Sequence, residues 1–199
     1  MPPKAKITKD MIVEAAFAIA REEGAENINA RAVAQKLGCS TQPVMYHFSK
    51  IEDLKKAVYA KADEYHSAYI TDIGDSPDGP MKGIGLRYIQ FAVEEGNLFR
   101  FLFQSNGFEK KSLLELIDGE ELEPVLAIMA QATGTDPEAV KTIFLTIFLV
   151  AHGYASMFAN NEMTYDEAVV SAHLDLAYRG AILAAQEERK WENCMRKMN

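Results

Sequence analysis

The sequence predicts an all-α protein in which an N-terminal three-helix helix-turn-helix domain is joined to a larger C-terminal helical bundle domain. Three observations predict this class. Apolar residues recur at spacings of three and four along most of the chain, and no segment alternates as a strand would. One loop rich in Asp, Gly and Pro, residues 71–80, interrupts the helical pattern. We expect the helix-turn-helix domain to span 1–56 and the second domain 57–199.

The first helix is expected to open at Thr8 or Asp10 and to stop at Gly24. Between these limits Ile12 and Ile19 belong to an apolar face with helical spacing. The helix should therefore make about four turns, one side of which is buried.

Two short helices should follow, separated by a tight turn. Asn29 is a good N-cap for ARAVAQKL, and Gly38 suits the position after that helix. Ser40 can then cap a helix that begins TQPVMYHF, in which Pro43 falls in the first turn and costs no helical hydrogen bond. This order of helix, glycine-containing turn and helix predicts a helix-turn-helix.

The remaining chain is predicted to be a series of longer helices. Ser49 and Glu52 form a capping box for a helix to about residue 70. Pro137 at a first helical position and Thr164 with Glu167 mark two later starts. The expected helices lie at about 81–95, 97–105, 111–132, 137–160 and 165–190.

Composition excludes several classes of protein. With 48% hydrophobic and 25% charged residues, the 199-residue chain is neither disordered, collagen-like nor a disulfide scaffold. Cys39 and Cys194 form no C-x-x-C pair, and the N-terminal ten residues lack the apolar core of a secretory signal. We therefore expect a reduced, cytoplasmic protein.

Charge is unevenly distributed along the chain. The net charge is −8, yet residues 1–56 carry nine basic and seven acidic side chains, a balance of +2. The other 143 residues carry 12 basic and 22 acidic side chains, a balance of −10. A mildly basic module on an acidic body is typical of a protein that meets an anion at one end.

The second helix of the motif carries side chains suited to DNA. Thr and Gln can hydrogen-bond base edges in the major groove, Arg can bind guanine, and Tyr, His and Lys suit phosphates. The candidate DNA-binding residues are Arg31, Ser40, Thr41, Gln42, Pro43, Tyr46, His47 and Lys50. The partner they predict is double-stranded DNA.

The same segment resembles the TetR family of bacterial transcriptional regulators. The matching residues are Ile12 with Ala15 and Ala16, Gly24, Val33 and Ala34, Leu37 and Gly38, Ser40, His47 and Phe48, and Leu54. Two positions depart from the family pattern: Met45 stands where members commonly have Tyr, and Ile51 where they have Lys. Tyr46 and Lys50 are each displaced by one residue from those phosphate contacts.

The resemblance implies a homodimer formed through the last two helices and a C-terminal domain of about six helices that binds a small-molecule effector. Two apolar stripes agree with the dimer. One stripe is Ile143, Ile147, Val150, Tyr154 and Phe158, and the other is Val169, Ala172, Leu176, Gly180 and Leu183. The ordinary alternative is that both stripes face only their own domain.

The effector, if largely apolar, would need aromatic and Met side chains with a few polar groups. The candidate pocket residues are Phe91, Phe103, Met129, Phe144, Phe148, His152 and Met157, with Phe99 and Tyr154 beside them. The alternative for each is plain core packing.

The sequence favours neither a membrane span nor an enzyme. Residues 142–159 contain no charged side chain, but polar residues within them and acidic flanks favour a helix buried by its own domain and a second subunit. Glu94 and Glu95 diverge on a helix, and no Gly-rich phosphate loop occurs. No Cys, Ser elbow or carboxylate lies at ligand spacing in the sequence from His66, His152 or His173.

We therefore expect no catalytic activity, no metal, no cofactor and no membrane partner. The predicted function is a ligand-responsive repressor that binds a palindromic operator. The alternative is an α-helical protein-interaction module whose helix-turn-helix does not bind DNA.

Overall fold

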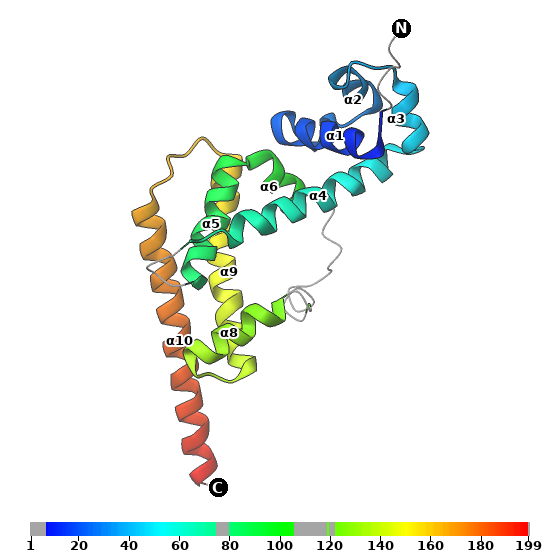
Figure 1. The fold of residues 1–199 in the computed structure, drawn as a ribbon. Coiled ribbons are helices and arrows are strands. Elements are labelled where there is room, and N and C mark those ends of the chain that lie inside the picture. Colours follow the sequence, from blue (N-terminus) through cyan, green and yellow to red (C-terminus); the bar gives the residue numbers. More distant parts are fainter. Residues whose placement is uncertain (1–6, 75–79, 106–118, 120–121, 199) are drawn as a thin grey trace. The chain divides into compact units, whose positions relative to one another are not determined.

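The computed structural model describes residues 7–74, 80–105, 119 and 122–198, and the regular structure in these ranges is helical (Figure 1). The chain separates into two compact units. The first contains residues 1–69 and 94–108, and the second contains residues 70–93 and 109–199. The start of the helix expected at 111–132 and the middle of the expected loop at 71–80 lie outside the described residues.

In the first unit, α1 (Lys9–Glu23) begins where the sequence predicts. The Thr8 side chain accepts a hydrogen bond from the Met11 N–H, so Thr8 is the N-cap. The helix ends at Gly24, whose φ of 98° favours glycine, and the 3₁₀ turn η1 (Ala25–Asn27) follows.

The next two helices form the helix-turn-helix. Asn29 caps α2 (Ala30–Lys36) by accepting from the N–H groups of Arg31 and Ala32. Gly38, with φ of 63°, makes the turn to α3 (Thr41–His47). Ser40 is the N-cap residue of α3, as predicted, but its side chain makes no capping hydrogen bond.

The first unit extends past the expected boundary at residue 56, which falls inside α4 (Ile51–Thr71). The helix α6 (Gly96–Phe103) also joins this unit and packs against α1. The Tyr59 hydroxyl on α4 donates to the Leu102 carbonyl on α6 at 3.2 Å. The core is formed by apolar side chains from all of these helices: Ile12, Ile19, Val33, Val44, Leu54, Val58, Leu98, Phe99 and Leu102. The helix-turn-helix therefore shares one core with α4 and α6.

A buried carboxylate connects three elements of the first unit. Glu95, only 7% exposed, lies between α5 (Pro80–Glu94) and α6 and accepts from both Nε and Nη2 of Arg21 on α1, the Nε at 2.7 Å. The Tyr65 hydroxyl on α4 donates to the same carboxylate at 3.0 Å. Hydrogen bonding to Glu95 raises the pKa of Arg21. The pKa of Tyr65 is raised mainly by burial and, to a smaller extent, by its hydrogen bond to Glu95.

We predict that His66 makes the first unit sensitive to acid. His66 on α4 is buried, its ring lies edge-on to Phe103 with centroids 5.0 Å apart, and burial lowers its pKa to about 4. The unfolded side chain titrates near its usual 6.5, so between pH 6.5 and 4 the unfolded state holds the extra proton. The contribution of neutral His66 to the free energy of unfolding should be fully present above pH 6.5. As the pH falls below 6.5, the free energy of unfolding should decrease by up to about 1.4 kcal/mol per pH unit.

The measurement is urea unfolding at pH 7, 5.5 and 4.5 for the wild type and His66→Leu. Carboxylates contribute equally to both proteins, so the difference between the two pH slopes isolates His66. Equal slopes would show that His66 does not cause the acid sensitivity.

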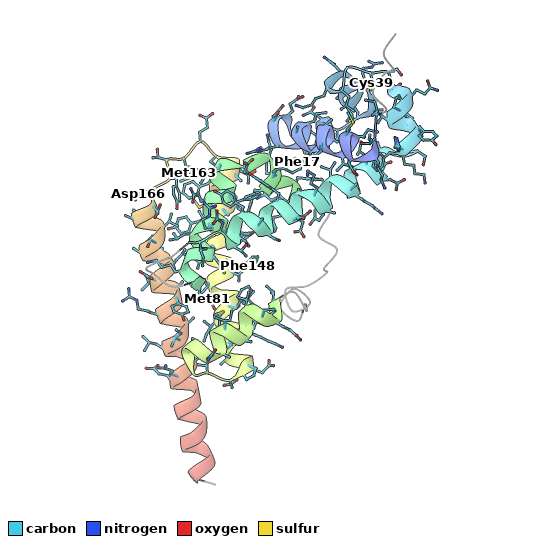
Figure 2. All side chains as sticks on the ribbon, in the orientation of Figure 1. Phe17, Cys39, Met81, Phe148, Met163 and Asp166 are labelled. Carbon is cyan, nitrogen blue, oxygen red and sulfur yellow. The ribbon has the colours of Figure 1, made fainter. Side chains whose placement is uncertain are left out.

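The second unit contains α5 as far as Val93, α8 (Glu123–Thr133), α9 (Pro137–Asn160) and α10 (Glu167–Met198), and α9 and α10 lie side by side (Figure 1). Pro137 is the first residue of α9, as predicted, and Asp136 is its N-cap. At α10 the Val169 N–H bonds the side chain of Asp166, labelled in Figure 2, so the residue that caps the backbone is Asp166 and not the expected Thr164.

One part of the core of the second unit comes from packing among α8, α9 and α10. Met129, Val140 and Ile143 form a fully buried cluster, against which the inner face of α10 packs. Lys82 on α5 and Asp175 on α10 form an ion pair at 2.9 Å. These contacts leave the opposite face of α10 exposed.

Candidate functional site

Helix α3 presents one polar face to solvent. Val44 and Phe48 point into the core of the first unit, which places Thr41, Gln42, Met45 and Tyr46 on the outer side. We call these four residues the α3 face. Tyr46 is 83% exposed, and its ring touches His47 edge-on. The core of the first unit does not require these four exposed side chains, so the α3 face is available to a partner.

The predicted DNA-binding residues differ in exposure. Arg31, at the start of α2, is exposed, as are Ser40 and Lys50, while Pro43 is half-buried. His47 is also half-buried, and its Nε2 lies 3.2 Å from the Ile7 carbonyl oxygen. In this structure His47 therefore holds the segment before α1, a role that the sequence did not reveal.

The segment that contains α2 and α3 carries a net positive charge. Residues 27–50 contain Arg31, Lys36 and Lys50 and no acidic residue. Lys36 is engaged with Glu22 of α1 at 2.6 Å, so its charge is partly compensated. The positive charge beside the α3 face comes chiefly from Arg31 and Lys50.

The second unit has an aromatic row that contains three of the predicted pocket residues. Phe144, Phe148 and His152 follow one another at intervals of four on α9, and their rings stack in sequence; Figure 2 labels Phe148. Tyr88 on α5 lies against Phe148, and its hydroxyl is 2.9 Å from His152 Nδ1. Burial raises the pKa of Tyr88 and lowers that of His152, so both are neutral near pH 7.

The other predicted pocket residues do not join this row directly. Phe91 is fully buried on α5, and Met129 belongs to the cluster of Val140 and Ile143, against which Phe144 also packs. Phe103 lies in the first unit against His66, and Met157 is 48% exposed. Sequence reasoning missed Tyr88, although its place three residues before Phe91 on an apolar helix was a usable signal.

Helices α9 and α10 each carry an exposed stripe with few charges. On α10 the stripe is the predicted one: Val169, Ala172, Leu176, Gly180 and Leu183 are exposed. On α9 the predicted stripe is largely covered by its own unit: Ile143 is buried, and Ile147, Val150, Tyr154 and Phe158 are half-buried. The exposed stripe on α9 is Thr142, Thr146, Leu149, Gly153 and Met157. We call the two exposed stripes together the outer seam.

Comparisons with solved structures identify the fold. A TetR-family member from Streptomyces coelicolor has 19% sequence identity and a TM-score of 0.55, over 84% of this chain and 96% of that one. A protein from Mesorhizobium loti, assigned to the TetR-family transcriptional regulators, has 18% identity and a TM-score of 0.55, over 88% and 95%. No family model and no curated protein matches the sequence.

The geometry defines a class: an all-α protein with an N-terminal helix-turn-helix whose second helix is exposed. Together with these two structures it shows that the chain has the fold of the TetR-family regulators. The fold class predicted from the sequence is confirmed.

Proposed function

We propose that this protein is a DNA-binding transcriptional regulator and not an enzyme. The observation that carries the proposal is the α3 face, which is exposed, rich in hydrogen-bonding groups and lies in a segment, residues 27–50, that contains Arg31 and Lys50 and no acidic residue. Helices of this kind enter the major groove, where their side chains meet base edges. The two structures of the same fold are both assigned to a family of regulators.

The regulator is proposed to act as a homodimer on a near-palindromic operator. One helix of seven residues offers few base contacts, and two-fold symmetry doubles them. The outer seam supports this proposal, because each of its two stripes runs along a long helix, consists of uncharged residues and is left open by its own unit. The recognition helices would enter successive major grooves about 34 Å apart.

The outer seam also bears on where the protein resides. Among the described residues, α9 alone is long and apolar enough to cross a membrane. Thr142, Thr146 and Gly153 on its exposed stripe suit close helix packing between subunits better than contact with lipid. We propose a cytoplasmic dimer with no membrane partner.

Selection of bound sequences from random DNA duplexes tests the function. A regulator should enrich one near-palindromic sequence, and the affinity for it should fall steeply with salt because bound counterions are released. An α-helical interaction module would enrich nothing and would not be retained on heparin. That outcome would remove the proposed function.

Two substitutions should separate base reading from anchoring. Gln42→Ala removes an exposed amide suited to adenine and should cost about 1–3 kcal/mol on the selected site, with relaxed preference at one base pair. Lys50→Ala should weaken all sequences alike and reduce the salt slope by about one. Binding titrations at several salt concentrations provide the measurement. A change of base preference in Lys50→Ala alone would reverse these roles.

We further propose that the regulator is a repressor released by a small, largely apolar effector. The aromatic row with Tyr88 and His152 supports this, since it combines stacked rings with one neutral polar pair. A compound that binds the second unit should weaken the affinity for the operator by a certain factor, and bound DNA should weaken the affinity for the compound by the same factor. If no apolar compound alters DNA affinity, this part of the proposal fails while DNA binding stands.

A further inference from the structure

Met45 is an unexpected residue on the α3 face. It is 46% exposed, while Val44 and Phe48 beside it fill the core. At about 100° per residue, Met45 lies roughly 40° from Thr41 and 60° from Gln42 around the helix. A large apolar side chain therefore stands between the two polar side chains best placed to read bases.

Packing within the unit covers about half of this side chain. A buried Met fills gaps in a core, but about half of Met45 remains in water. A protein-docking surface would need a contiguous apolar patch. The other members of the α3 face are Thr41, Gln42 and Tyr46, and the flanks are Arg31 and Lys50, so Met45 stands among hydrogen-bonding and cationic groups.

The chemistry of the major groove supplies an apolar partner. Each base edge there offers hydrogen-bonding groups, and thymine alone adds a methyl group, at C5. We infer that Met45 is a specificity-determining residue that packs against a thymine methyl in each half of the operator. This inference rests on the proposed function and deepens it, because it names one base that the operator must contain and the atom by which that base is recognised.

The first experiment compares two selections with the full-length protein. One random duplex pool contains thymine, and the other contains deoxyuridine, which pairs identically but lacks the methyl group. Wild type should enrich a thymine at one position of each half-site in the first pool and lose that preference in the second. Met45→Gln, which keeps the length of the side chain but not its apolar end, should lose the same preference in the thymine pool, and Met45→Leu should retain it.

The second experiment measures coupling on the sequence selected by wild type. Replacing the relevant thymine by deoxyuridine in one half-site should weaken wild-type binding about fourfold, the factor that corresponds to burying one methyl group at about 0.8 kcal/mol. The same replacement should leave Met45→Gln unchanged, so the two effects would not add. Met11→Gln on α1, where the Met is 38% exposed, is the matched control and should respond as wild type.

Each outcome decides the inference. A site without a conserved thymine among the selected duplexes, or an equal loss on deoxyuridine replacement in wild type and Met45→Gln, would overturn it while leaving DNA binding intact. Failure of both pools to enrich any sequence would instead remove the proposed function, and the inference with it. Because Met45 is exposed, the circular dichroism and melting temperature of Met45→Gln should match those of wild type.

Discussion

Leu176→Glu should convert the protein from a dimer into a monomer. Leu176 is 69% exposed and lies in the middle of the outer seam, with Ala172 and Gly180 one turn away on either side. In a two-fold dimer both copies of the Leu would be covered, and each would lose about 2 kcal/mol of burial on replacement. The two carboxylates would also be brought together in the interface without partners.

The loss of the dimer should lower operator affinity by about 100-fold or more, because a monomer can hold only one half-site. Sedimentation velocity at micromolar concentration measures the first effect, and DNA titration measures the second. Ile128→Glu, at an apolar position on α8 that is 52% exposed, is the control and should remain dimeric. A dimeric Leu176→Glu would place the interface elsewhere, and a monomeric wild type would remove the dimer altogether.

Arg21→Met should destabilise the first unit by about 2–4 kcal/mol. The change removes the Arg21 guanidinium and leaves the Tyr65 hydroxyl as the remaining one of the two donors to the buried Glu95 carboxylate described above. Removing one partner of a buried ion pair costs about 3–5 kcal/mol. Arg21 itself is half-exposed, so water reaching the gap should reduce the loss toward the lower end. Faster amide hydrogen exchange in α1 and α6 reports the loss locally.

A second ion pair on α1 provides the control. Lys61 on α4 and Glu14 on α1 approach to 2.6 Å, but the Glu14 side chain is 62% exposed and that of Lys61 is 32% exposed. Because Glu14 stays hydrated without its partner, Lys61→Met should cost no more than about 1 kcal/mol. Glu95→Gln should also be milder than Arg21→Met, because a neutral amide removes the buried charge and retains a hydrogen-bonding group. If Arg21→Met and Lys61→Met were equally mild, Glu95 would not be a structural anchor.

Local signals made the helix-turn-helix predictable. Thr8, Asn29 and Ser40 all occupy the N-cap positions expected of them, and Gly24 and Gly38 end their helices with positive φ. These assignments succeeded because a cap and the backbone groups that it bonds are only a few residues apart, so a short stretch of sequence is enough to predict the cap. The α10 stripe was likewise visible, since its spacing of three and four lies on one helix.

Features that depend on contacts between residues far apart in the sequence could be assigned only from the tertiary structure. The amphipathic pattern of α9 is ambiguous because apolar residues surround most of the helix, and only packing against Met129 shows that Ile143 faces inward while Leu149 and Met157 face outward. The pairing of Arg21 with Glu95 spans 74 residues, and that of Tyr88 with His152 spans 64.

The sequence by itself therefore determined the helical class, the helix ends near the motif and three residues of the α3 face, Thr41, Gln42 and Tyr46. The tertiary structure decided that α4 and α6 share a core with the helix-turn-helix, that His47 holds the segment before α1, and which face of α9 is exposed. The physical reason is the distance along the chain over which each interaction acts. Caps and helical periodicity act within one or two turns, whereas burial, ion pairing and pKa shifts depend on which distant side chains the fold brings into contact.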